Sequence, residues 1–267
     1  MFWVRFRSSC IIAVLAVLSL VLGGRVLWGV LLAISLIGMM ELYRVLKVHG
    51  AAPGAVGYAA CILYFILLLC GQQEQLTVFF IGFFLVLMLC YVLTFPKYRS
   101  EQVTMVFFGF FYAAVMLSYV WQLREAEGGA YLVWMVFIGS WGSDTCAYLI
   151  GRKFGKHKIV PKLSPKKSVE GCIGGMLGAA ALGALFAAVF FGQLSMLRQP
   201  VAAFALMGAA SSVISQLGDW AASAIKRNHD VKDYGRLIPG HGGVMDRFDS
   251  VIFTAPVIYY LAQLVAA

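Results

Sequence analysis

The stretch KDYGRLIPGHGGVMDRFDS, residues 232–250, concentrates acids, bases and glycines in a chain that is 61% hydrophobic and only 12% charged. Its acids Asp246 and Asp249 follow soon after Asp219, and three carboxylates that share one site do not all ionise unless cations neutralise them. Carboxylate oxygens are hard ligands of the kind that Mg²⁺ prefers, and no cluster of Cys or His indicates zinc. Because Mg²⁺ beside Lys and Arg is suited to phosphate groups, the stretch predicts chemistry on a phosphorylated substrate.

The glycines of the same stretch predict an anion-binding turn. Gly240, Gly242 and Gly243 permit positive φ and close backbone approach, so the segment can present N–H groups to an anion. A tight loop requires the same residues, and the turn alone is therefore weak evidence. His241, held between glycines, is a candidate for a phosphate contact, with a solvated loop residue as the equal alternative.

Two acids, Asp144 and Asp219, lie inside apolar segments, where an unpaired carboxylate costs at least a few kcal/mol. Such residues are functional candidates by default, although bonding to neighbouring Ser or backbone groups is an equal alternative for either segment alone. Helical spacing puts further polar residues on the same face as each acid. These are Ser212, Ser215, Ser223 and Lys226 with Asp219, and Ser140 and Tyr148 with Asp144.

The elements that must position these residues are membrane helices. Apolar runs close to the length of roughly 20 residues that crosses a bilayer recur through the chain of 267 residues. The candidate spans are 10–23, 26–43, 55–70, 76–95, 103–122, 130–150, 169–192, 201–225 and 250–266. Since only Gly23, Gly24 and Arg25 separate the first two runs, the count is nine, or eight if those two merge. We expect an all-α fold, a polytopic integral membrane helical bundle.

The distribution of basic residues predicts the orientation of this bundle. With the N-terminus in the cytoplasm and the C-terminus outside, only Arg25, Arg124 and Arg198 of the 21 Lys and Arg residues lie in outside loops. The predicted inside loops 151–171 and 226–250 are long and basic. Contact with anionic headgroups, worth about 1 kcal/mol per basic residue, explains their lysines but leaves the acids and the HGG turn unexplained.

These features divide the chain into two regions. Residues 1–138 form an N-terminal region of about five transmembrane helices. Residues 139–267 form a C-terminal catalytic region that carries both basic cytoplasmic loops.

The run SAIKRNHDVKDYGRLIPGHGGVMDRFD, residues 223–249, resembles the signature of phosphatidate cytidylyltransferases, the CDP-diacylglycerol synthases. The signature positions are filled by Ser223, Lys226, Arg227, Lys232, Asp233, Gly235, Pro239, His241, Gly242, Gly243, Asp246, Arg247 and Asp249. Upstream, DTCAYLIGRKFGKHK and SPKKSVEG also resemble the family, in which the second usually reads SPKKT; Ser168 keeps the hydroxyl of that threonine. The resemblance begins near residue 139, whereas the first five spans match only in hydrophobic character.

The resemblance implies a reaction of phospholipid biosynthesis in which phosphatidic acid and CTP give CDP-diacylglycerol and pyrophosphate. Asp219, Asp246, Asp249, Lys226 and Arg227 would be catalytic. Asp219, Asp246, Asp249 and Asp144 would bind Mg²⁺, with a second cation as a further expectation. The implied substrate- and phosphate-binding residues are Ser164, Lys166, Lys167, Ser168, Ser223, Lys232, Asp233, Gly240, His241, Gly242, Gly243 and Arg247.

The substrates implied by the resemblance also predict a location and partners. Phosphatidic acid is confined to the bilayer and CTP to water, so we expect a site at the cytoplasmic face of the cytoplasmic (inner) membrane. Membrane lipids and a second copy in a homodimer are expected partners, and nucleic acid is not.

Two alternative functions remain open. A CTP-dependent polyprenol or phytol kinase would transfer the γ-phosphoryl group instead. A cation or lipid transporter would use Asp144 and Asp219 to bind the translocated cation. The transporter predicts symmetric access across the membrane, against which the basic residues lie overwhelmingly on one face.

Overall fold

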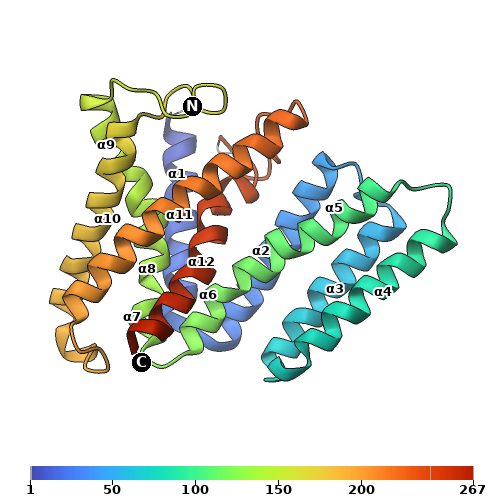
Figure 1. Ribbon diagram of the computed structural model, residues 1–267, viewed down its shortest axis with the longest axis horizontal. Coiled ribbons are helices and arrows are strands. Elements are labelled where there is room, and N and C mark those ends of the chain that lie inside the picture. The colour runs from blue at the N-terminus through green and yellow to red at the C-terminus, as the bar shows by residue number, and fades with distance from the viewer. Residues whose placement is uncertain (1, 241, 267) are drawn as a thin grey trace. The chain divides into compact units, whose positions relative to one another are not determined.

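The computed structural model describes residues 2–240 and 242–266, and the chain forms a set of helices joined by short connections (Figure 1). The elements of 11 residues or more are α1 (Phe2–Leu22), α2 (Gly24–Val45), α3 (Ala52–Leu69), α4 (Leu76–Leu93), α5 (Ser100–Phe110), α9 (Ser143–Phe154), α10 (Val169–Val189), α11 (Pro200–Asn228) and α12 (Met245–Ala266). The shorter elements are the 3₁₀ turns η1 (Gln73–Gln75) and η4 (Phe191–Gln193), the π-helices η2 (Phe111–Val115) and η3 (Ile138–Gly142), and α6 (Met116–Glu125), α7 (Gly129–Leu132) and α8 (Trp134–Phe137). The predicted all-α fold is confirmed.

Seven helical stretches within residues 2–240 and 242–266 are long and apolar enough to cross a membrane. They are Gly24–Val45, Ala52–Leu69, Gln73–Leu93, Ser100–Glu125, Val169–Val189, Pro200–Asn228 and Met245–Val265. The chain is therefore a polytopic helical membrane protein, as predicted. The first and sixth predicted spans are not among the seven, so the exact count of nine and the sides of the two termini stay predictions.

The first two apolar runs form separate helices. Gly23 and Gly24, between α1 and α2, adopt φ values of 60° and 50°, which residues with a side chain rarely adopt. The apolar part of α1, Arg7–Leu22, is shorter than a typical span.

The sixth predicted span, 130–150, is broken into α7, α8, η3 and α9 rather than forming one α-helix. The average hydropathy of this run is high, but it does not indicate that the run contains weak α-helix formers. These are Gly139, Ser140, Gly142 and Ser143. Of the three residues predicted to share a face, Ser140 lies in the π-helix η3, whereas Asp144 and Tyr148 lie in α9, and the shared face stays a prediction. Ser140 is buried and donates its hydroxyl to the carbonyl of Val136 in the preceding α8.

Both predicted basic loops are shorter in the structure than in the sequence interpretation. Since α9 extends to Phe154 and α10 begins at Val169, the first loop comprises residues 155–168, which we call the basic hairpin. Since α11 extends to Asn228 and α12 begins at Met245, the second comprises residues 229–244, which we call the charged loop. Asp246 and its neighbours thus lie in the first two turns of α12, where a helix N-terminus favours negative charge.

The described chain divides into two compact units, Met1–Ser118 with His229–Arg247, and Tyr119–Asn228 with Phe248–Ala267. The first unit contains α1 to α5 and the charged loop. The second contains α7 to α11 with the basic hairpin and most of α12. The division at residue 138 was drawn on function and stays a prediction.

The helices of the first unit pack closely, and α3, α4 and α5 lie side by side (Figure 1). The buried Tyr43 of α2 donates its hydroxyl to the carbonyl of Val106 at 2.7 Å. Gly57 and Gly109 leave the room that the Tyr43 ring occupies, because a Cβ at either position would meet that ring. A cluster of phenylalanines, including Phe83 and Phe110, fills the space between α4 and α5.

Small residues bring the helices of the second unit together in the same way. A Cβ at Gly183 would lie 3.1 Å from the carbonyl carbon of Phe204, and one at Gly208 would lie 2.8 Å from that of Ala179, so α10 and α11 touch through their backbones. Gly174 of α10 packs against Ile150 of α9. Such small-residue contacts are typical of helix packing within membranes, where backbones approach closely.

Candidate active site

A cavity of about 610 Å³ in the second unit gathers six of the predicted site residues. They are Asp144, Ser164, Lys166, Lys167, Ser168 and Asp219. Arg152 and Lys158, which the sequence interpretation did not single out, line the same cavity. Four basic and two acidic side chains therefore share one pocket, formed by α9, α11, the start of α10 and the basic hairpin.

The basic hairpin is closed at its base by backbone contacts. Lys158 and Ser168 form an isolated antiparallel bridge, and the N–H of Val169 donates to the carbonyl of His157 at 2.8 Å. Ser168 caps α10, because its hydroxyl accepts the N–H of Gly171 at 3.2 Å. The lysines of the hairpin are thus carried by a loop whose two ends are fixed.

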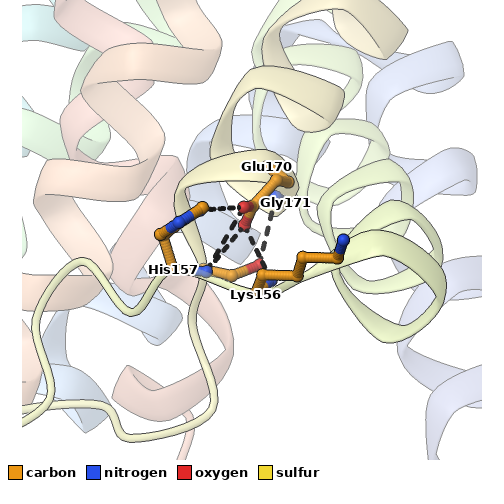
Figure 2. Close-up of polar contacts among 5 residues, drawn as sticks. Lys156, His157, Glu170 and Gly171 are labelled. Carbon is orange, nitrogen blue, oxygen red and sulfur yellow. Dashed lines mark hydrogen bonds and ion pairs between the residues drawn. The ribbon is translucent and has the colours of Figure 1, made fainter.

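Glu170 ties the start of the basic hairpin to α10 (Figure 2). Its carboxylate accepts the backbone N–H groups of Lys156 and His157 at 3.1 and 3.2 Å. The same carboxylate lies 2.6 Å from Nδ1 of the His157 ring. Glu170 is therefore a structural residue of the hairpin, and His157 is occupied at its base.

Lys167 of the basic hairpin forms an ion pair with Asp219 of α11. The two side chains are each 28% exposed, so the pair lies at the partly open wall of the cavity. The pair links the basic hairpin to α11. It places the ammonium group of Lys167 beside the carboxylate of Asp219, which the sequence predicts to bind Mg²⁺.

The polar face predicted for α11 is partly confirmed. Ser212 faces α9, where its hydroxyl lies 2.6 Å from that of Ser143, and Asp219 lines the cavity. Ser215, one turn before Asp219, is fully buried. Gln216 extends this network, donating to Ser212 and to the carbonyl of Cys172, both at 3.2 Å.

Asp144 and Asp249 meet at the hydroxyl of Ser250. Ser250 Oγ lies 3.4 Å from Asp144 Oδ2 and 3.4 Å from Asp249 Oδ1, and its backbone N–H donates to Asp249 Oδ1 at 2.8 Å. Asp249 and Ser250 are 7% and 2% exposed. Two carboxylates from different helices, α9 and α12, thus share one buried hydroxyl in the second unit.

Asp246, in the first unit, has a different environment. Its Oδ2 accepts the N–H of Tyr234 at 2.8 Å and that of Gly243 at 3.0 Å. Asp246 therefore holds the charged loop from within. Its predicted role as a metal ligand stays a prediction.

The glycines of the charged loop serve its fold in different ways. Gly240 and Gly242 have φ values of 78° and 87°, in agreement with the expected positive φ. Gly242 accepts the N–H of Ile238 at 2.9 Å. Gly243 has no positive φ value, and its N–H is bonded to Asp246, so this N–H serves the loop itself.

The structure places the remaining predicted residues as follows. Ser223 and Lys226 are half-buried and Arg227 is exposed at the end of α11 in the second unit. Lys232 and Asp233 are exposed in the charged loop, and Arg247 is half-buried in the first turn of α12. The predicted phosphate contact of His241 lies outside the described residues.

The donor set in the second unit fits Mg²⁺ by its chemistry. Carboxylate and hydroxyl oxygens are hard donors of the kind that Mg²⁺ prefers. Asp144 and Asp249 share the hydroxyl of Ser250, and the carboxylate of Asp219 is paired with the ammonium group of Lys167. Across residues 2–240 and 242–266, however, no three His, Cys, Asp or Glu side chains are grouped as metal ligands.

Sequence reasoning missed several residues of the site, and only some left a signal. Arg152 and Lys158 belong to the basic segment noted above, but nothing in the sequence says that they face the cavity. Ser250 directly follows Asp249, the last position of the signature. Glu41, a buried acid in α2, was overlooked although an ionisable residue in an apolar span is a functional candidate.

The chain is similar in sequence to known proteins over nearly its whole length. The sequence model described as the Cytidylyltransferase family matches residues 3–265. The chain is 32% identical over 264 residues to the phosphatidate cytidylyltransferase of Bacillus subtilis (strain 168), covering 95% of both chains. It is 30% identical to the phosphatidate cytidylyltransferase of Synechocystis sp., covering 97% of this chain and 96% of that one. It is 32% identical to that of Staphylococcus aureus (strain COL), covering 95% and 96%.

Proposed function

The chain belongs to the cytidylyltransferase family, and we propose that it transfers the cytidylyl group of CTP to phosphatidic acid, giving CDP-diacylglycerol and pyrophosphate. The proposal agrees with the names of the relatives in Bacillus subtilis, Synechocystis and Staphylococcus aureus. The observation that carries it is the cavity in which Arg152, Lys158, Lys166 and Lys167 face a space lined also by Asp144 and Asp219.

The reaction joins two polyanions, and this explains the basic residues of the cavity. An oxygen of the lipid phosphate attacks the α-phosphorus of CTP, a new P–O bond forms, and the bond to the β-phosphate oxygen breaks to release pyrophosphate. A phosphate monoester has a second pKa near 6 and is already mostly a dianion at neutral pH, so its attack requires no strong general base. Charge neutralisation and alignment are the main requirements.

We assign the cations of the basic hairpin to these tasks. Lys166 and Lys167 would bind phosphate oxygens, since an ammonium group donates charge-assisted hydrogen bonds to them. Arg152 can bind two phosphate oxygens at once through its planar guanidinium. When phosphate enters, Lys167 exchanges part of its contact with Asp219 for a phosphate oxygen.

We assign Mg²⁺, the expected cofactor, to Asp144, Asp219 and Asp249, with Asp246 as a further candidate. Bound there, the ion would neutralise charge on the triphosphate. Ser250 keeps Asp144 and Asp249 at a fixed separation, and Lys167 balances Asp219. The second cation expected from the resemblance is part of the same proposal.

The proposed reaction also requires access from two phases. Phosphatidic acid arrives through the bilayer and CTP through water, so the basic hairpin and the charged loop should face the cytoplasm in the cytoplasmic (inner) membrane. The basic residues support this orientation through the positive-inside rule.

The first test follows the fate of labelled CTP. Purified protein in phosphatidate-containing micelles with Mg²⁺ receives CTP labelled at the α-phosphate, for wild type, Lys167→Ala and Lys162→Ala. Lys162 is an exposed lysine of the same hairpin and is not among the lining residues, which makes it a matched control. We expect label in the lipid and released pyrophosphate for wild type and Lys162→Ala, and about a hundredfold lower kcat/KM for Lys167→Ala, a loss within the range for removal of a charge-stabilising group.

The alternatives give different products. Transfer of γ-phosphate from CTP to a polyprenol or phytol, with CDP released, would establish the kinase reaction instead. If well-folded wild type transfers neither the cytidylyl group nor the γ-phosphate of CTP, the proposed function fails.

A further inference from the structure

Glu41 lies in α2 of the first unit and is only 2% exposed. Its two carboxylate oxygens each accept one backbone N–H: Oε1 that of Val244 at 3.1 Å and Oε2 that of Met245 at 2.9 Å. Val244 ends the charged loop and Met245 begins α12. Glu41 thus satisfies two N–H groups that a helix start leaves without a partner in the helix.

Two glycines of the charged loop make this contact possible. A Cβ at Gly243 would lie 2.6 Å from the carboxylate carbon of Glu41, and a Cβ at Gly235 would lie equally close to the same atom. Real Cβ atoms do not approach so closely, so any larger residue would displace either the loop or Glu41. The close approach of Glu41 therefore explains why both positions are glycine, and this explanation does not involve a bound anion.

The charged loop is then held by two carboxylates with separate tasks. Asp246 bonds Tyr234 and Gly243 within the segment, whereas Glu41 holds the end of the loop from another helix. Because both carboxylates accept backbone N–H groups, Glu41 and Asp246 fix the path of the main chain irrespective of neighbouring side chains.

We propose that Glu41 is a positioning residue, whose carboxylate sets the path of the charged loop and the start of α12 without touching a substrate. The proposal rests on the proposed function, because its readout is cytidylyl transfer. It goes beyond that function by assigning a role in activity to a helix outside the region that carries the family signature.

The chemistry of the side chain predicts a graded response. Gln keeps the shape but has one acceptor oxygen and an NH₂ group, which would face a backbone N–H and repel it. Asp keeps both acceptor oxygens on a side chain one methylene shorter, and it vacates space next to Gly243.

The experiment measures kcat, KM for both substrates and the melting temperature of Glu41→Gln, Glu41→Asp, Gly243→Ala and the double variant Glu41→Asp/Gly243→Ala. Glu74→Gln, at an exposed glutamate of the same unit, is the control. We expect Glu41→Gln to lower kcat roughly tenfold or more with KM changed less than about threefold, since a misplaced loop impairs alignment more than binding. Gly243→Ala alone should be nearly inactive, and the shorter Asp should restore its kcat by about fivefold or more, as expected for two residues in contact.

Each contrary result has a distinct meaning. If wild type transfers no cytidylyl group, the proposed function fails. If wild type is active and Glu41→Gln retains its kcat, the contacts of Glu41 do not affect catalysis and the proposal is wrong. If kcat falls only in proportion to a lower melting temperature, or if the double variant is no better than Gly243→Ala, the contact is merely structural and the proposal is wrong.

Discussion

The buried and half-buried acids of this chain differ in what their carboxylates contact. Glu41 and Asp246 accept backbone N–H groups and so hold the main chain, whereas Asp219 meets an ammonium group. Asp144 and Asp249 share the hydroxyl of Ser250, and Asp249 also accepts the backbone N–H of that residue. Two carboxylates that share one hydroxyl repel each other when both are ionised, and a cation bound beside them would offset this repulsion.

Ser250→Ala tests the role of this shared hydroxyl at the residue scale. Loss of the hydroxyl removes the hydrogen-bond donor that Asp144 and Asp249 share, and we expect kcat/KM to fall about tenfold, the effect of about 1.4 kcal/mol. The Mg²⁺ concentration for half-maximal activity should rise as well. Ser140→Ala is the control, since that buried hydroxyl donates to a backbone carbonyl, that of Val136, and not to a carboxylate in the contacts described. An unchanged Mg²⁺ dependence in Ser250→Ala would contradict the assignment.

At the scale of elements, hydropathy and charge predicted much of the architecture and little of its detail. The all-α membrane fold follows from the length and apolar character of the runs. The cavity brings together some of the lysines and acids that the resemblance implied, namely Lys166, Lys167, Asp144 and Asp219. The breaks in the sixth span were missed because a hydropathy average is insensitive to Gly139 and Ser140. The start of α12 was placed five residues late, because the charges of Asp246 and Arg247 looked like loop.

The charged loop shows a second limit of sequence reasoning. Its glycines were expected to present N–H groups to an anion, yet Gly243 donates to Asp246 and leaves room for Glu41. A partner more than 200 residues distant gives no local pattern that could have indicated this contact. Only the three-dimensional arrangement distinguishes a glycine needed for positive φ from one needed for close approach.

Glycine packing between α10 and α11 carries the element-scale prediction. Gly208→Val would drive a branched side chain into the backbone of Ala179, which has no flexible end to move aside. We expect a loss of about 1–3 kcal/mol of stability, the usual cost of overpacking, seen as a lower melting temperature in detergent. Gly82→Val in α4 is the matched control, because a Cβ there meets no described atom within 4 Å. Equal melting temperatures for the two variants would contradict the packing described.

At the scale of the whole molecule, the orientation in the membrane is the property on which the proposed access of both substrates depends. The basic residues predict that the end of α3 lies outside and the basic hairpin lies in the cytoplasm. Cys70, an exposed natural cysteine next to the end of α3, provides a probe for the first of these positions.

The whole-molecule prediction uses a membrane-impermeant thiol reagent on chains with a single cysteine. Cys70 alone should be labelled in intact cells or spheroplasts. A chain with Lys162→Cys alone should be labelled only after the membrane is opened. The reverse pattern would place the site on the outer face and exclude the proposed access of CTP.

The contact between Glu41 and Val244 joins residues 203 positions apart, and this has a consequence for biosynthesis. At the usual rates of translation, α2 is made roughly 10–40 s before the N–H groups that its glutamate accepts. During that interval the carboxylate of Glu41 is without these two N–H partners. The charged loop therefore takes its final path only when the last helix enters the membrane, so a nascent chain remains inactive until its synthesis is almost complete.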